Sequence, residues 1–386
     1  MRSEHISEQL TDDLRLKMSQ ISFSKNPNDS VEPIRSKTDI LRDYRIVRKI
    51  GKGLFSKVYL AIDPSGRKVG LKTIEKKNFV AKEAIEKIII EKEILKRIDH
   101  KNVLKLYRTM QTNSQIYFVL EYADKGNLLN LINAKRLTPE QIRVIVAQVI
   151  EALFYLHGKG IIYGDLKAEN ILLNKQGVVK LCDFNLSGTT SLLNDTIQGT
   201  VSYIAPEILE GKERTSMSDF WSLGILTHLL FYKRLPFKSS NQTELFFNVI
   251  NKSIEPETRE NRAPRALREF ICDLLNKNPK KRLGQSMRDF VSHPFFESFD
   301  WKNYSNNTKN FGYAEGIPCY DELEPLDISN AEEHHLLHQT PNQNFMYHIQ
   351  GFTYENGDIP KMQNGLGSYK EKQGIREGDK GNDVGF

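Results

Sequence analysis

The sequence predicts an α+β fold in two lobes, the first rich in strands and the second mainly helical. Short β-like runs begin at Tyr44 (YRIVRKI, KVYLAID, KVGLKTI, then KLYRTM and IYFVLEY) and are separated by glycine and Pro-Ser-Gly turn signals. One helical pattern, residues 81–98, interrupts these runs with apolar residues near one face. Helical periods dominate after Gly126. We therefore expect a five-stranded sheet with one long helix, followed by a helical lobe.

The flanks of these lobes have a different composition. Residues 1–43 are polar and lack sustained periodicity, which predicts a flexible N-terminal extension. Beyond about residue 300 the composition shifts to Asn, His, Tyr and Glu, which predicts a folded-back tail over 300–355. The Gly- and charge-rich end, 356–386, predicts disorder. Within the helical lobe, Thr138 before Pro139 and a closing Gly158 predict the ends of one long helix.

Composition indicates a soluble globular protein. The chain has 386 residues, of which 39% are hydrophobic and 27% charged. Its net charge of +6 is spread along the chain, so nucleic acid is not an expected partner. The three widely spaced cysteines, Cys182, Cys272 and Cys319, indicate a reducing compartment. No segment approaches the roughly 20 apolar residues of a membrane span, and we expect a cytoplasmic protein, with the nucleus as an alternative.

A glycine-rich turn is the first candidate for phosphate binding. Gly51, Lys52 and Gly53 lie between two predicted strands, where glycines let a backbone approach phosphates closely, although an ordinary turn has the same pattern. Lys72 lies about twenty residues further on, on an adjacent strand, where its ammonium can hold phosphates, although an ordinary surface lysine is the alternative. Glu91, in the predicted helix, can form an ion pair with Lys72 or remain solvated.

Three further motifs follow in order: Tyr163-Gly-Asp165-Leu-Lys167-Ala-Glu-Asn170, Cys182-Asp183-Phe184-Asn185 and Ala205-Pro206-Glu207. Together with the glycine turn and Lys72 they resemble the protein-kinase set, over roughly residues 44–299. IIYGDLKAENILL, GTVSYIAPEIL, KNPKKRLG and HPFFESFDW resemble the AGC group of serine/threonine kinases, especially the cyclic-nucleotide-dependent kinases. The resemblance implies a bilobal protein kinase fold, with an antiparallel sheet and regulatory helix in an N-lobe (44–122) and a mainly helical C-lobe (123–299).

The resemblance also implies a role for each motif residue. The implied catalytic residues are Asp165, Lys167, Lys72 and Glu91. Asp165 would accept the proton of the substrate hydroxyl and Lys167 would neutralise the transferred γ-phosphoryl, because this chemistry depends mainly on positioning and charge neutralisation. Asn170 and Asp183 would hold magnesium through oxygen ligands. The implied cofactors are ATP and Mg²⁺, with Mn²⁺ able to replace it.

The implied nucleotide pocket lies between the lobes. Adenine would lie between Val58 and Leu172 and bond to the backbone around Glu121 to Ala123, with Leu120 at the back. The residues implied to contact ATP are Gly51, Lys52, Gly53, Val58, Gly70, Lys72, Leu120, Glu121, Ala123 and Leu172.

Other matches are assigned to the scaffold. Glu207 and Arg282 resemble a buried ion pair that braces the activation segment, and Asp219 resembles a carboxylate that caps the backbone before Asp165. An apolar column would cross both lobes, although ordinary core packing would need the same residues: Leu95, Leu106, Tyr163 and Phe184.

Several positions depart from the family pattern. Gly164 replaces an arginine and Gly188 a lysine, so Lys87 alone would remain to bind a phosphate on Thr196, and we expect weak or no gating by that phosphorylation. Asn185 replaces the glycine of an Asp-Phe-Gly turn, and because Asn tolerates positive φ we expect the active turn to survive.

Further departures affect substrate and nucleotide binding. Ser56 replaces the third loop glycine, and Gly70 replaces an alanine that packs on adenine. Asn127 and Leu229 replace two acids that select arginine in substrates, while Glu169 remains, so a strong basophilic preference is not expected.

Near the C-terminus, Ile349-Gln-Gly-Phe352-Thr353-Tyr354 resembles the AGC hydrophobic motif, which docks beside the helix at 81–98, although an ordinary apolar patch is an alternative. Thr353 is a candidate phosphosite. The expected partners are protein substrates, ATP and an upstream kinase acting on Thr353 or Thr196.

Two functions from different classes remain open. The first is an active serine/threonine protein kinase. The second is a pseudokinase that serves as an ATP-binding or scaffold module, motivated by Ser56, Gly70, Gly164 and Asn185. Retention of all six implied catalytic and metal residues favours the first.

Overall fold

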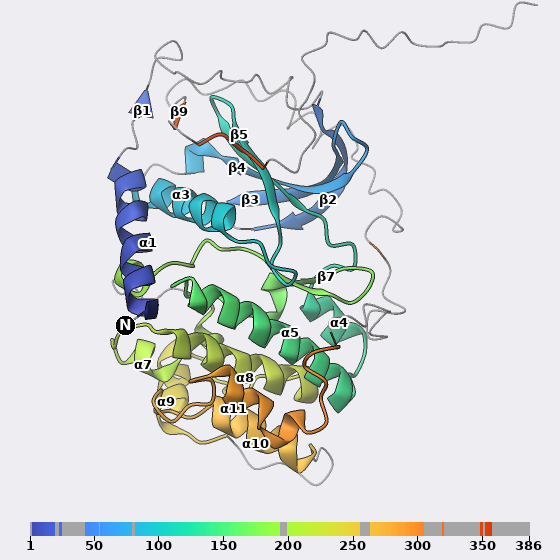
Figure 1. Cartoon of the computed structure of the whole chain (residues 1–386), viewed down its shortest axis with the longest axis vertical. Coiled ribbons are helices and arrows are strands. Elements are labelled where there is room, and N and C mark those ends of the chain that lie inside the picture. The colour runs from blue at the N-terminus through green and yellow to red at the C-terminus, as the bar shows by residue number, and fades with distance from the viewer. Residues whose placement is uncertain are drawn as a thin grey trace, which may run out of the picture.

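The structure is a computed structural model that describes residues 2–19, 23–24, 43–53, 55–78, 82–193, 199–254, 263–304, 319, 348–349 and 352–356. Figure 1 shows two lobes, with a sheet and α3 (Lys82–Arg97) in the upper lobe and a stack of helices in the lower lobe. The upper lobe contains β2 (Arg45–Lys52), β3 (Ser56–Ile62), β4 (Lys68–Glu75), α3 (Lys82–Arg97), β5 (Leu106–Gln111) and β6 (Gln115–Glu121). The predicted α+β fold in two lobes is confirmed.

The lower lobe contains one strand pair and most of the helices. Its strands are β7 (Ile171–Leu173) and β8 (Val179–Leu181). Its helices are α4 (Leu128–Ala134), α5 (Pro139–Gly158), α6 (Thr190–Leu193), α7 (Pro206–Leu209), α8 (Ser216–Tyr232), α9 (Gln242–Asn251), α10 (Arg265–Leu274) and α11 (Met287–Val291). Short 3₁₀ turns follow β4 and occur in the lower lobe at Ala168–Asn170, Val201–Tyr203 and Pro294–Phe296.

The sheet of the upper lobe has six antiparallel strands, in the order β10-β5-β6-β4-β3-β2. Five of them are the predicted strands. The sixth, β10 (Tyr354–Glu355), comes from the C-terminal tail and pairs with β5 opposite Thr109 and Arg108. Without β10, β5 would be an edge strand with unpaired backbone groups, which an added strand satisfies. The prediction of five strands was therefore one short, because the tail completes the sheet.

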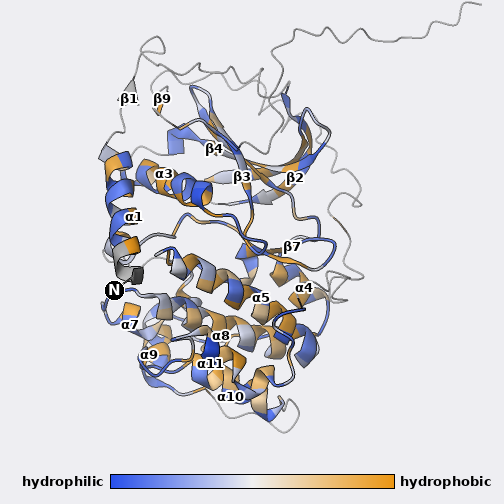
Figure 2. Ribbon diagram, viewed as in Figure 1, coloured by the Kyte–Doolittle hydropathy of each residue, from blue (hydrophilic) through white to orange (hydrophobic). Residues whose placement is uncertain are grey.

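Helices α5 and α8 pack against each other at the centre of the lower lobe, and both carry much orange in Figure 2. Helices that are apolar on most sides are stable only when buried. α5 begins as predicted, with the Thr138 hydroxyl accepting from the Gln141 N–H and Pro139 at the first position. Gly158 is its last residue, but the left-handed glycine that turns the chain is Gly160, at φ +73°.

Helix α1 (Arg2–Ser19) precedes the upper lobe. The sequence predicts a flexible extension over residues 1–43, and the structure instead has a helix in its first half. Leu10 and Leu14 are buried in the same core cluster as the apolar residues of α3, whereas Leu16 is 54% exposed. Because only this narrow face is apolar, the sequence signal is weak and the helix depends on packing against α3. Strand β1 (Phe23–Ser24) pairs with β9 (His348–Ile349).

Among the helices of the described ranges, none has the length and apolar character required to cross a bilayer.

His228 gives the lower lobe a dependence on pH. Its ring lies buried in α8, where Nδ1 donates to the Arg234 carbonyl at 2.8 Å. Burial lowers the pKa of His228 to about 4, and the nearby charges of Arg234 and Lys238 act in the same direction. The unfolded chain therefore binds a proton at a higher pH than the folded chain, so the stability from neutral His228 is lost as pH falls from about 6.5 to 4.

We predict that acidification over this range lowers the free energy of unfolding by up to about 3 kcal/mol through His228. The measurement is chemical denaturation at several pH values, with His228→Gln as a control that keeps a hydrogen-bond donor but does not titrate. An equal acid sensitivity in both proteins would contradict this assignment.

Candidate active site

Three ionisable residues meet where the two lobes face each other. Lys72, on β4, places its Nζ 2.7 Å from Glu91 Oε1 on α3 and 3.3 Å from Asp183 Oδ1. Lys72 and Glu91 are both buried, whereas the Asp183 side chain is 36% exposed. The structure thus brings together residues separated by 19 and by 111 positions in the sequence.

Burial by itself lowers the pKa of Lys72, but the carboxylates of Glu91 and Asp183 outweigh it and raise the pKa above its usual value. Lys72 is therefore a fixed positive charge at physiological pH. A buried ion pair of this kind depends on both members, because removing one leaves the other charge uncompensated in a medium of low polarity.

Glu91 also accepts a hydrogen bond from the backbone N–H of Phe184, which ties α3 to the Asp-Phe-Asn turn. From the sequence, Asn185 is expected to be the position where this turn needs tolerance of positive φ. Instead Asp183 has φ +61°, and Asn185 is absent from the described residues with positive φ. The conformational strain thus lies at Asp183, a residue type that visits this region more often than most.

Asp165 lies next to these residues in the loop before β7. Its Oδ2 accepts hydrogen bonds from Lys167 Nζ at 2.7 Å and from Asn170 Nδ2 at 2.8 Å. Lys167 also donates to the Thr200 hydroxyl at 3.0 Å, which joins the loop to the segment beyond Gly199. Two bonds to one carboxylate oxygen fix the orientation of Asp165 and direct its Oδ1 elsewhere.

Asn170 and Asp183 offer a donor set that suits magnesium. The Asn170 amide nitrogen binds Asp165, which leaves its oxygen as the ligand atom, and Asp183 adds a partly exposed carboxylate. Magnesium is typically held by one or two protein oxygens together with substrate phosphates. No cluster of three or more His, Cys, Asp or Glu side chains suited to a metal occurs among the described residues.

The residues expected to contact the nucleotide line up on three adjacent strands. Val58 on β3 lies opposite both Gly51 on β2 and Lys72 on β4. Gly53 closes the turn to Ser56, its N–H donating to the Ser56 carbonyl at 2.8 Å. Lys52 ends β2, and Leu54 between Gly53 and Phe55 lies outside the described residues.

The other residues expected to contact the nucleotide lie on β4, on β6 next to it in the sheet, and on β7 of the lower lobe. Gly70 lies opposite Leu120, and a Cβ added at Gly70 would be 3.5 Å from the Glu121 carbonyl oxygen, an ordinary contact distance. Ala123 is buried just beyond β6, and Leu172 lies at the centre of β7. Gly70 therefore enlarges this region by about one methyl group without altering the backbone.

Cys182 borders these residues but is chemically protected. Its Sγ lies 3.3 Å from the Asn170 carbonyl oxygen, and burial raises the pKa of the thiol well above its usual value. It behaves as a core residue.

The model of the protein kinase domain family matches residues 44–296, which is more than half of the chain. The chain belongs to the protein kinase family.

The kinase domain has curated relatives in several animals. It is 34% identical over 280 residues to the human putative 3-phosphoinositide-dependent protein kinase 2, an alignment that covers 69% of each protein. It is also 34% identical to rat 3-phosphoinositide-dependent protein kinase 1, over 69% of this chain and 49% of the relative. The RAC serine/threonine-protein kinase of Drosophila melanogaster is 32% identical, over 68% of this chain. The chain spans about half the length of the rat relative and 44% of the fly relative. The fly relative is by name a serine/threonine kinase.

The scaffold pairs expected for a kinase are confirmed. Arg282 donates to both carboxylate oxygens of Glu207, at 2.7 and 2.8 Å, with both side chains buried. Asp219 accepts from the backbone N–H groups of Tyr163 and Gly164, each at 2.9 Å. The residues of the predicted apolar column are all buried: Leu95, Leu106, Tyr163 and Phe184.

The C-terminal hydrophobic motif docks in the upper lobe beside α3, as expected. Ile349 and Phe352 are fully buried, and the Phe352 ring meets Phe118 edge-on at 5.8 Å. Thr109 and Gln111 of β5 donate to the backbone carbonyls of Phe352 and Ile349, at 2.6 and 2.7 Å. Thr353 is exposed. Thr196, the other candidate phosphosite, lies outside the described residues.

No sequence signal predicts the contacts of α1, which Figure 1 shows running beside both lobes. The Thr11 hydroxyl is 2.6 Å from the Thr189 hydroxyl at the start of the activation segment (residues 183–207), and Asp13 forms an ion pair with Arg97 of α3. In the lower lobe, a Cβ on Gly160 would lie 2.8 Å from Ser7 Cα, so glycine allows this close approach. Helix α1 thus joins α3, the activation segment and the lower lobe.

We predict that Leu14→Asp detaches α1, because an unpaired carboxylate cannot be buried without a large cost. We expect kcat to fall about tenfold, equivalent to ~1.4 kcal/mol of lost preference for the active position of α3. Peptide phosphorylation kinetics and hydrogen exchange of residues 2–19 measure the two effects. Leu16→Asp, on the exposed face, is the matched control, and equal effects of both substitutions would contradict the role of α1.

Loss of the tail contact gives a second prediction. Phe352→Ala should lower the free energy of unfolding by about 3–5 kcal/mol if the docked tail unfolds with the domain, because it removes a fully buried ring. Phe247→Ala is the control, since that ring is 58% exposed. The measurements are thermal unfolding and kinase activity. Removal of residues after about 345 with no change in either would show that the docked motif is dispensable.

Proposed function

We propose that this chain is a protein kinase that transfers the γ-phosphoryl group of Mg-ATP to serine or threonine hydroxyls of proteins. The observation that carries the proposal is the meeting of Lys72 with Glu91 and Asp183, which requires α3 and the Asp-Phe-Asn turn to be in place at once. AGC kinases among the relatives support the serine/threonine class. The finer likeness to cyclic-nucleotide-dependent kinases rests on the sequence motifs.

In the proposed mechanism, Asp165 accepts the proton of the substrate hydroxyl through Oδ1 while Oδ2 is held by Lys167 and Asn170. The hydroxyl oxygen bonds to the γ-phosphorus, and the bond from that phosphorus to the bridging oxygen breaks, releasing ADP. Lys167 neutralises charge on the moving phosphoryl group, and Lys72 binds the remaining phosphates.

Asn170 and Asp183 would hold the magnesium that the family uses. When bound, magnesium supplies positive charge that neutralises the phosphate oxygens. The contact of Lys167 with Thr200 supports a hydroxyl substrate of the serine/threonine class, as the motif resemblance implies. The glycine turn from Gly51 to Gly53 would cover the phosphates.

Substrate selection should differ from that of arginine-directed kinases. Asn127 is the N-cap of α4, where its side chain accepts from the Asn130 N–H at 3.0 Å, and Leu229 is buried in α8. Of the three positions considered for arginine recognition, Glu169 alone is an exposed acid. We propose that the kinase accepts a broad range of peptides and requires at most one basic residue in its substrate.

We also propose Thr353 as a site for an upstream kinase. It is exposed beside buried Phe352, whose ring lies 5.4 Å from Lys92 Nζ. Added phosphate would lie near the basic residues of α3 and strengthen docking of the tail. The contact of Thr11 in α1 with Thr189 supports weak or no gating by phosphorylation of Thr196, because it holds the start of the activation segment without a phosphate.

Three of the four positions that motivate the pseudokinase alternative, namely Gly70, Gly164 and Asn185, do not favour it. Gly70 leaves the backbone contacts of β4 and β6 intact, and Asn185 avoids positive φ. Gly164 occupies φ +81°, a conformation in which glycine is the natural residue.

We predict that the purified chain transfers labelled phosphate from Mg-ATP to a degenerate peptide library, and that Asp165→Ala lowers the rate about 10²–10⁴-fold, the usual contribution of a general base. Asp12→Ala, an exposed aspartate on α1, should retain full activity. Thermal shift with Mg-ATP reports nucleotide binding separately. A wild-type chain that binds Mg-ATP but transfers no more phosphate than Asp165→Ala would contradict the proposed function and favour the pseudokinase.

A further inference from the structure

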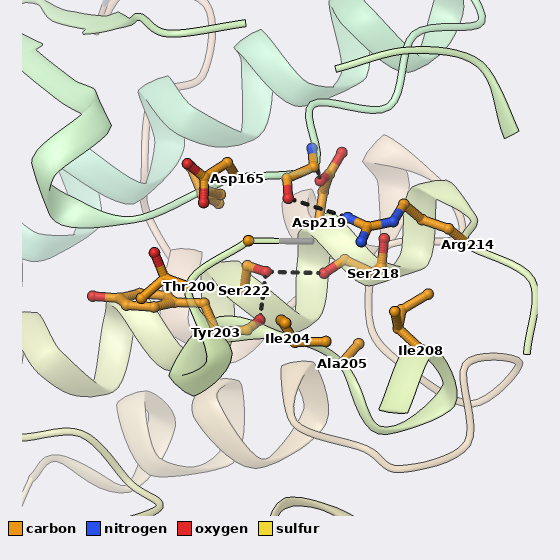
Figure 3. A pocket seen from close by; sticks show the side chains of 13 residues that line it. Asp165, Thr200, Tyr203, Ile204, Ala205, Ile208, Arg214, Ser218, Asp219 and Ser222 are labelled. Carbon is orange, nitrogen blue, oxygen red and sulfur yellow. Dashed lines mark hydrogen bonds between the residues drawn. The ribbon is translucent and has the colours of Figure 1, made fainter. Parts of the chain in front are cut away.

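Arg214 is a charged side chain buried beside the active site. It lies in the loop between α7 and α8, is 6% exposed, and lines a pocket together with Asp165, Thr200 and Tyr203. Figure 3 shows its guanidinium pointing towards Asp219 and the backbone next to it. Because a buried charge is costly unless it is paired and hydrogen-bonded, the partners of Arg214 indicate what it does.

One hydrogen bond of Arg214 goes to the residue immediately before Asp165. Its Nη1 donates to the Gly164 carbonyl at 3.2 Å, while the Gly164 N–H donates to Asp219 Oδ1 at 2.9 Å. Gly164 is therefore held at both ends, its N–H by a carboxylate and its carbonyl by a guanidinium. That carbonyl belongs to the peptide bond that leads into Asp165, so fixing it fixes the plane from which the Asp165 side chain projects.

Gly164 needs such external support. Its φ is +81°, and an added Cβ would lie 2.5 Å from the Leu186 carbonyl oxygen, so no side chain can occupy this position without a backbone shift. Glycine is the most flexible residue and has no side chain to pack. The same hypothetical Cβ would be 3.4 Å from Arg214 Nη1, which means that the guanidinium fills the space next to Gly164.

Two nearby carboxylates, Asp219 in α8 and Asp165 in the loop before β7, compensate the charge of Arg214. Burial lowers the pKa of Arg214, and the carboxylates of Asp219 and Asp165 act against that decrease. A guanidinium remains charged in proteins and offers several fixed donors, so it suits this position better than lysine.

We propose that Arg214 is a positioning residue for phosphoryl transfer, which holds the Gly164 carbonyl and thereby orients Asp165. The inference rests on the proposed kinase function. Arg214 also borders a second pocket, lined by Lys87, Asn185 and Leu192. The test must therefore distinguish the positioning role from an alternative in which Arg214 binds an anion in that pocket.

The test compares Arg214→Ala and Arg214→Lys with Arg265→Ala, an arginine whose side chain is 84% exposed. We expect kcat to fall about 10²-fold in Arg214→Ala with KM for Mg-ATP unchanged, since a misplaced general base slows transfer without affecting nucleotide binding. Guanidinium chloride at concentrations well below denaturation should restore part of kcat, and urea, a neutral molecule of the same shape, should not. Arg214→Lys should be intermediate.

Each protein is assayed before and after phosphatase treatment. An equal loss of kcat and an equal rescue by guanidinium before and after phosphatase treatment support the positioning role. Any of three results would overturn the positioning role. The first is an unchanged kcat in Arg214→Ala, and the second is a loss of kcat confined to the phosphorylated protein. The third is a loss of kcat that neither added guanidinium nor the lysine substitution reverses. If Arg214→Ala fails to fold, Arg214→Lys and Arg214→Gln assayed below their melting temperatures decide by the same criteria. An inactive wild type would contradict the proposed function instead.

Discussion

The ion pair between Lys72 and Glu91 is the contact on which the rest of the upper lobe depends. It exists only when α3 lies close to β4, and several separate elements keep α3 there. Phe184 donates to Glu91, α1 packs its buried leucines against α3, and the C-terminal motif fills the space between α3 and β5. Since burial makes each unpaired charge costly, these contacts act together rather than as independent increments.

Segments that flank the kinase domain therefore have a structural part in it. Helix α1 precedes the domain and β10 follows it, yet each completes a surface that the domain leaves apolar or unpaired. β1 and β9 pair with each other, so the two flanking segments also meet. The position of α3 therefore depends on contacts made by other segments of the same chain, and these contacts can open locally without unfolding of the whole domain.

The catalytic loop follows a similar principle on a smaller scale. Asp165 is aimed by Lys167 and Asn170 through its side chain, and by Asp219 and Arg214 through the backbone at Gly164. Fixed geometry matters here because phosphoryl transfer requires little covalent help and much positioning. The flexible residue Gly164 can precede an Asp165 of fixed orientation only because both its N–H and its carbonyl are hydrogen-bonded.

The sequence by itself determined the two lobes, five strands, the caps of α5 and the motif residues that meet in the active site. These features are encoded locally, by periodicity, turn residues and capping side chains, or by motif spacing within one family. It did not predict α1, β10 or the position of strain at Asp183. Only the tertiary structure decided them, because α1 is stabilised by two leucines packed on a distant helix, β10 by an edge strand far along the chain, and Asp183 by an ion pair with Lys72, 111 residues away. The support of Gly164 by Arg214, 50 residues away, is of the same kind. Long-range contacts of this kind leave no periodic signal in either partner.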